Sequence, residues 1–113
     1  MEEITRVEPM RFFVDDTEYV LEFNRDTVKY AEDNGFSRKD AEDKMMIRIP
    51  ELFYYALRMH QPEIKRSQAD DLYFNVLEGL TPGEIERLVD LFNAPYSTLI
   101  RTGERKNSRV RML

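Results

Sequence analysis

The sequence contains no cysteine among its 113 residues. A disulfide framework and a thiolate metal site are therefore excluded, and the absence favours a reducing, cytoplasmic setting. No apolar run approaches the roughly 20 residues that cross a bilayer. The first residues, MEEITRVEPM, are polar and acidic and do not resemble a signal peptide. We therefore expect a soluble chain with no membrane segment.

Side chains that carry out catalysis are also scarce. The one histidine, His60, lies at a predicted helix C-terminus, where we expect it either to interact with the helix dipole or to make one hydrogen bond in the core. It lacks the HExxH or carboxylate spacing of a metal site. The four glycines are scattered singly, so the sequence has no glycine-rich phosphate-binding loop. We expect no enzyme activity, no metal and no cofactor.

The net charge of −5 is unevenly distributed. Residues 101–113 (RTGERKNSRVRML) carry +4, from five basic residues and one Glu, so residues 1–100 carry −9. An acidic body argues against a nucleic-acid-binding protein, because such proteins neutralise phosphates with basic residues. We expect residues 1–9 to be a loose leader and residues 102–113 a flexible basic tail. Residues 10–101 suit a single domain in length.

Two stretches of alternating hydrophobicity predict an N-terminal antiparallel β-hairpin. Its apolar positions are Met10, Phe12 and Val14, followed by Tyr19, Leu21 and Phe23. The turn is expected at Asp16-Thr17. A lone hairpin is marginally stable in water, so its apolar face must pack on helices or on another sheet. Its free edges offer a way for copies to pair, which makes a homo-oligomer plausible.

Helix signals follow the hairpin at five places. N-cap residues and prolines in first turns mark the predicted starts. These starts are Asn24, Ser37, Pro50, Ser67 and the pair Thr81-Pro82. Gly35, Pro62 and Gly79 are expected to end three of the helices, and Pro95 must break or kink the last one. The predicted fold class is α+β: an N-terminal hairpin followed by a helix-dominated bundle of four to five helices.

Two further details concern the later helices. In the helix that begins at Ser67, the side chains of Leu72, Val76 and Leu77 are expected to face the core. In the helix that begins at Thr81, Glu84 is expected to complete a capping box with that threonine.

The segment Glu51 to His60 is apolar almost all round, which is typical of a central helix or of one with an outside partner. Leu52, Phe53, Ala56 and Leu57 share the face that we expect to be core. The chain has seven Phe, six Tyr and six Met. These are more large contact-forming side chains than the core of a domain of this size can bury. Those at the edge of the core stripes are candidates for partner binding, since Met-rich and aromatic surfaces repack around varied amphipathic helices. The candidates are Tyr54, Tyr55, Met59, Phe92 and Tyr96.

The order of these features resembles a family of short phage and prophage proteins regarded as tail assembly chaperones. The resemblance lies in FFVDDTEYVLEFNRDTVKYAEDNGF, then IPELFYYALRMHQPEI, then LEGLTPGEIERLVDLFNAPYSTLI, which together cover nearly all of residues 10–101. The chain departs from the pattern at Asp16-Thr17, where a glycine would be expected, and at Met10–Phe13, which is more apolar. The basic end after Arg101 lies outside the pattern.

The resemblance implies a non-enzymatic role in the tail assembly of a long-tailed phage. Such chaperones bind the tape measure protein, a very long and largely helical chain, and keep it soluble until tail-tube subunits polymerise around it. A longer, frameshifted form adds a domain that recruits the tube subunits, and this chain would correspond to the short form. The implied location is the bacterial host cytoplasm, with none of the chaperone in the mature virion.

Two other classes of function stay open. One is a phage-encoded interaction adaptor that binds a single host or virion protein with no chaperone role. The other is RNA binding through the arginine-rich tail, which predicts a steep salt dependence that vanishes when residues 102–113 are deleted. Broad binding to several helical segments would favour the chaperone over the adaptor.

Overall fold

The computed structural model describes residues 7–100 and 108–112, and over these residues it confirms the predicted fold class. A two-stranded antiparallel hairpin precedes five α-helices. The elements are β1 (Met10–Val14), β2 (Thr17–Leu21), α1 (Arg25–Asp33), α2 (Arg38–Asp43), α3 (Met45–Arg58), α4 (Arg66–Asp71) and α5 (Pro82–Asn93). A π-helical turn, η1 (Leu72–Val76), continues α4, and a 3₁₀ turn, η2 (Ala94–Thr98), continues α5.

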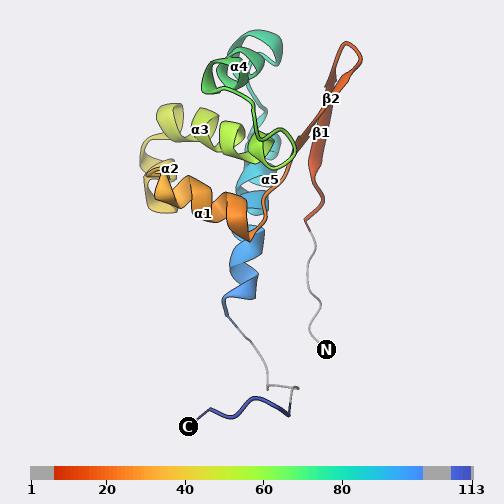
Figure 1. Cartoon of the computed structure of the whole chain (residues 1–113). Helices are drawn as coiled ribbons and strands as arrows, with labels where there is room; N and C mark the ends of the chain where they lie inside the picture. The colour runs from red at the N-terminus through yellow and green to blue at the C-terminus, as the bar shows by residue number, and fades with distance from the viewer. Residues whose placement is uncertain (1–6, 101–107, 113) are drawn as a thin grey trace.

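Helix α3 is the centre of the fold (Figure 1). It contacts α1, α2, α4, α5 and strand β2. Its predicted core residues are buried, with Leu52 1% exposed and Phe53, Ala56 and Leu57 at 0%. Buried side chains from the hairpin and the helices form one hydrophobic cluster around them. The apolar character of α3 thus follows largely from its central position.

The hairpin has the predicted inward face, but its turn lies one residue earlier than expected. Val14 pairs with Thr17, so Asp15 and Asp16 form a two-residue turn, and Asp15 has a φ of 53°. Aspartate tolerates this left-handed conformation better than most residues, which explains a tight turn without glycine. On the inward face, Phe12 stacks on Tyr19 with 5.1 Å between ring centroids.

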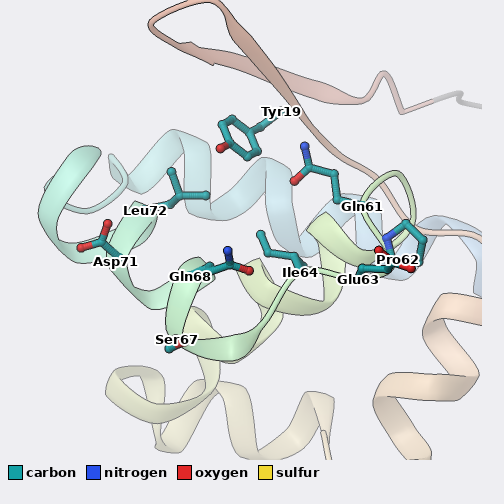
Figure 2. Close-up of a pocket in the computed structure, with 9 residues that line it drawn as sticks. All are labelled: Tyr19, Gln61, Pro62, Glu63, Ile64, Ser67, Gln68, Asp71 and Leu72. Carbon is teal, nitrogen blue, oxygen red and sulfur yellow. The ribbon is translucent and has the colours of Figure 1, made fainter.

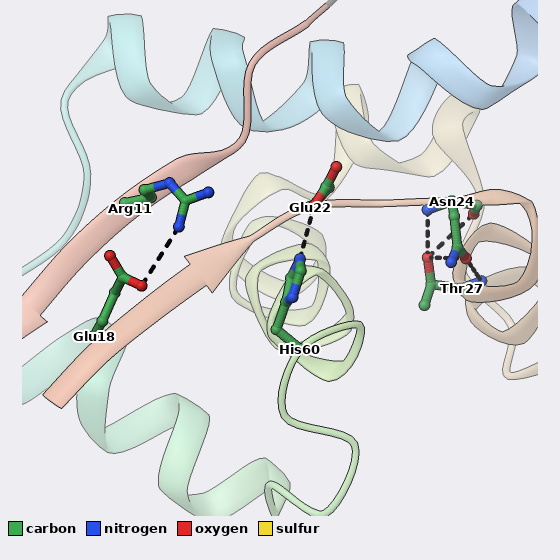
Figure 3. Close-up of polar contacts among 6 residues, drawn as sticks. All are labelled: Arg11, Glu18, Glu22, Asn24, Thr27 and His60. Atoms are coloured by element: carbon green, nitrogen blue, oxygen red, sulfur yellow. Dashed lines mark hydrogen bonds and ion pairs between the residues drawn. The ribbon is translucent and has the colours of Figure 1, made fainter.

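Helix α1 begins and ends as predicted. Asn24 Oδ1 accepts a hydrogen bond from the Thr27 N–H at 2.9 Å, and Thr27 Oγ1 accepts one from the Asn24 N–H at 2.8 Å (Figure 3). Gly35 has a φ of 92°, a conformation that favours glycine. The Phe36 N–H then donates to the carbonyl of Ala31 at 3.0 Å, which folds the Phe36 ring back into the core.

Helix α3 begins at Met45, so the prediction that it starts near Pro50 was wrong. Pro50 is the sixth residue of the helix and removes the hydrogen bond to the carbonyl of Met46. Pro50 is buried, but the carbonyl that loses its partner belongs to Met46, a residue that is 85% exposed, so water can replace the missing donor. The extra turn carries Met45, Met46 and Ile47, which are 50%, 85% and 57% exposed.

Two of the predicted N-caps form no side-chain cap. Ser37 precedes α2, but its hydroxyl makes no capping hydrogen bond. Helix α4 starts before Ser67: its N-cap is Lys65, whose N–H donates to Gln68 Oε1 at 2.9 Å. By contrast, the predicted capping box of α5 is confirmed, since Glu84 N–H donates to Thr81 Oγ1 at 3.2 Å and Thr81 N–H donates to Glu84 Oε1 at 2.8 Å.

The π-helical turn after α4 changes which side chains face inward. The Leu77 N–H donates to the carbonyl of Leu72 at 2.8 Å, five residues back rather than four. The wider turn changes the angles at which the side chains within it project. Tyr73 is therefore buried at 7% exposure, whereas Val76, which was expected to face inward, is 43% exposed.

The predicted ends of the domain are described only in part. Val7 packs partly buried against the core, so the end of the expected leader contacts the fold. Residues 1–6, 101–107 and 113 lie outside the described residues. In the described part of the expected tail, residues 108–112 are exposed. Among the described residues, no helix is long and apolar enough to cross a membrane.

Candidate functional site

The structure does not bring the five sequence-predicted candidates onto one surface. Tyr55 and Phe92 are 6% and 1% exposed and belong to the core cluster, so the expectation that they lie at its edge was wrong. Tyr54, Met59 and Tyr96 are half-buried. Burial raises the pKa of Tyr55 above its usual range, as expected for a phenol in the core.

Tyr54 belongs to a stack of tyrosine and arginine side chains on the side of α3 that faces α1. The Arg58 guanidinium lies 4.3 Å from the Tyr30 ring centroid and 5.9 Å from that of Tyr54. Arg58 Nη1 also donates to the Tyr54 hydroxyl at 3.3 Å. Tyr54 thus positions Arg58, and the stacking of Arg58 on Tyr30 joins α3 to α1.

Tyr96 joins η2 to α1 and α2. Its hydroxyl donates to Glu32 Oε2, and the Arg38 guanidinium lies 4.6 Å from its ring centroid. Burial, together with the hydrogen bond to Glu32, raises the pKa of Tyr96 from 10.0 to about 12. Tyr96 thus holds η2, which continues α5, against α1 and α2.

We expect the stabilising effect of the Tyr96 hydroxyl to disappear at high pH. The raised pKa means that the folded chain holds this proton more tightly than the unfolded chain, so the contribution is present below pH 10 and falls as the pH rises toward 12. Urea unfolding of the parent chain and of Tyr96→Phe at several pH values should show a difference in unfolding free energy that shrinks over this interval. A constant difference would contradict the assigned hydrogen bond.

His60 has a structural partner. Its Nε2 lies 2.7 Å from Glu22 Oε1, and this pair joins the end of α3 to the segment after β2 (Figure 3). The backbone supports the same junction, because the Glu22 N–H donates to the carbonyl of Ala56 at 3.2 Å. No group of three His, Asp or Glu side chains that could hold a metal ion occurs among the described residues.

A wide cleft of about 780 Å³ lies between the hairpin and α4 (Figure 2). Tyr19 points into it from β2, and Ile64 and Leu72 line the opposite side. Its rim is mostly polar, with Gln61, Glu63, Ser67, Gln68 and Asp71 beside the apolar Pro62. The cleft is open and mixed in character, without the continuous apolar floor that an amphipathic helix requires.

A more apolar depression lies between α2, α3 and α5. It has a volume of about 360 Å³, and Phe36, Ile49, Leu52 and Phe92 are among the core residues that reach it. A second depression of about 160 Å³ adjoins it and shares Met45, Ile49 and Ile85. We call the two together the apolar groove. Its remaining apolar lining residues are Ala41, Met46, Pro50, Tyr73, Phe74 and Val89.

The open end of the apolar groove presents large apolar side chains to solvent. Met45, Met46 and Phe74 are 50%, 85% and 50% exposed. Methionine side chains are flexible and polarisable, so they adapt to apolar partners of different shape. A concave apolar surface with an exposed methionine and phenylalanine border is the kind of groove into which an amphipathic helix packs.

Of the five predicted partner-binding residues, Phe92 alone lines the apolar groove, and it does so from within the core. Sequence reasoning missed Met45, Met46 and Phe74. The first two were missed because a proline in a first turn predicts a helix start near Pro50, and that start excludes Met45 and Met46. The apolar residues of MMIRIP, residues 45–50, could have indicated the longer helix. Phe74 was missed because only the packing of η1 beside α3 brings it next to Met45 and Met46.

Over its described residues the chain is a small, helix-dominated α+β protein with an apolar groove between α2, α3 and α5. The chain belongs to the family described as "Domain of unknown function (DUF5055)", whose model matches residues 6–112. No curated protein and no solved structure matches the chain.

Proposed function

We propose that this protein is a non-enzymatic tail assembly chaperone that binds helical segments of a phage tape measure protein. The observation that carries the proposal is the apolar groove with its exposed Met45, Met46 and Phe74. An exposed apolar surface of this kind is costly in water unless a partner covers it for part of the time. The resemblance in residues 10–101 supplies the identity of the partner.

The proposed mechanism is transient shielding. The client is the tape measure protein. One of its amphipathic segments packs its apolar face into the groove, so that this face cannot contact other client chains and aggregate. The acidic body, at −9 over residues 1–100, keeps the complex in solution through repulsion between like charges. Many copies share one long client and all must leave when the tube assembles, so affinity at each site is modest.

The rest of the proposal follows from the same role. The chaperone acts in the cytoplasm of the bacterial host and is absent from the mature virion. Tail-tube subunits join through a frameshift-extended form, and copies on one client can associate through the free edges of the hairpin. The proposed activity needs no cofactor, nucleic acid or membrane.

Co-expression with the tape measure protein encoded nearby tests the proposal. We expect the tape measure protein to stay soluble only when this chain is present, and to co-purify with many copies of it. If the tape measure protein is equally insoluble with and without this chain, and the two do not associate, the proposal fails.

The same experiment separates the chaperone from an interaction adaptor. An adaptor would bind a single host or virion protein tightly, with a fixed stoichiometry and no effect on the solubility of the tape measure protein. The chaperone should instead bind several different helical segments with similar affinity, because a methionine-bordered groove discriminates weakly among apolar faces.

A further inference from the structure

The walls of the apolar groove carry acidic side chains that form no ion pair with another described residue. Glu42 lies on the α2 wall, and Glu86 and Asp90 lie on the α5 wall. All three residues are exposed. None of their carboxylates takes part in any of the ion pairs between described residues.

One basic residue, Arg38, also lines the apolar groove among the described residues. Its guanidinium stacks over the ring of Tyr96 at 4.6 Å, so its position is already fixed by another contact. The second depression, around Met46 and Phe74, is lined without any charged residue among those described. The groove therefore combines an apolar floor with two carboxylates on the α5 wall and, on the α2 wall, the Glu42 carboxylate beside the Arg38 cation that stacks on Tyr96.

We infer that the partner of the apolar groove is an amphipathic helix whose apolar stripe is bordered by Lys or Arg on both sides. This inference rests on the proposed function and names the chemistry of the client segment. Exposed carboxylates on both walls attract cations at both borders of a helix that lies between them. Long basic side chains also reach outward from an apolar stripe while their methylene groups stay in contact with it.

The geometry of α5 sets the spacing of the cations. Glu86 and Asp90 are four residues apart, about 6 Å along the helix axis. A partner helix that lies along α5 presents matching charges when two of its basic residues are also four apart. A third basic residue on its other border faces Glu42. An acidic border would meet like charge on both walls and be rejected.

Three helical peptides with one shared apolar stripe test this inference on the full chain, with Lys, Gln or Glu at the three border positions. Binding is measured by fluorescence anisotropy at low and high salt. We expect the Lys peptide to bind about tenfold more tightly than the Gln peptide at low salt and the Glu peptide to bind most weakly. The preference should fade at high salt, where surface charges are screened.

A charge-reversed variant, Glu86→Lys with Asp90→Lys, should prefer the Glu peptide. The matched control, Glu63→Lys with Asp71→Lys, makes the same change in net charge at the other cleft and should keep the preference for Lys. If both variants lose the preference equally, the net charge of the body is responsible and the inference is overturned.

The remaining outcomes separate the inference from the proposed function. If the Lys, Gln and Glu peptides bind equally well, the basic border is wrong while the groove keeps its role as a helix-binding site. If no peptide and no tape measure protein binds, both fail. If deleting residues 108–113 tightens binding of all three peptides equally, the basic end of this chain is the resident occupant and the inference is overturned.

Discussion

Phe92→Ala should destabilise the fold by about 3–5 kcal/mol, close to the whole stability of a domain of this size. Phe92 is 1% exposed, and its ring lies 4.9 Å from that of Phe36, 5.1 Å from Phe23 and 5.6 Å from Tyr96. Removing it leaves a cavity where α1, α5 and the segment after the hairpin meet. Urea unfolding followed by circular dichroism measures the loss.

Phe74→Ala is the matched control, since it removes the same ring from a residue that is 50% exposed. We expect its free energy of unfolding to stay within about 1 kcal/mol of the parent chain. Client binding should weaken, because Phe74 borders the groove. If Phe92→Ala were as stable as the parent, Phe92 would not be the core residue that the structure shows.

Met46→Asp should weaken client binding at least about tenfold and leave stability nearly unchanged. Met46 is 85% exposed and lines the open end of the apolar groove. The new carboxylate would lie among the apolar residues that line this end of the groove, and the apolar stripe of a partner helix would strip it of water, which costs free energy. Because aspartate is favourable in the first turn of a helix, α3 itself should tolerate the change. Peptide anisotropy and client co-purification both report the effect.

Ile47→Asp is the control for Met46→Asp. It places the same charge one residue later in the same helical turn, at a side chain that is 57% exposed and is not among those that line the groove. We expect near-parental binding. If both variants lost client binding to the same extent, the added negative charge in the first turn of α3, rather than contact with the groove, would control binding.

Local signals predicted most of the fold. Asn24, Gly35 and the Thr81–Glu84 pair act through hydrogen bonds or φ angles set within a few residues, so the sequence shows them directly. Pro95 likewise ends α5 as its missing N–H requires. The hairpin predicted from the period-two pattern is also confirmed, because one buried face fixes its register.

The candidate site could not be predicted in the same way, because it depends on tertiary packing. Pro50 lies inside α3 because the helix is held by the core on several sides, which overrides the local preference of proline. The π-helical turn exposes Val76 and buries Tyr73. Tyr55 and Phe92 are core residues because rings from other parts of the chain pack on them: Tyr30 and Phe36 on Tyr55, and Phe23 and Phe36 on Phe92.

The central claim is that the client lies in the apolar groove. A photo-crosslinking residue at position 46, in chains co-expressed with the tape measure protein, tests it most directly. Position 13 serves as the control, because Phe13 is 66% exposed on the hairpin. We expect a covalent adduct with the tape measure protein from position 46 and little or none from position 13. Adducts from position 13 alone, or from neither position while the two proteins co-purify, would contradict it.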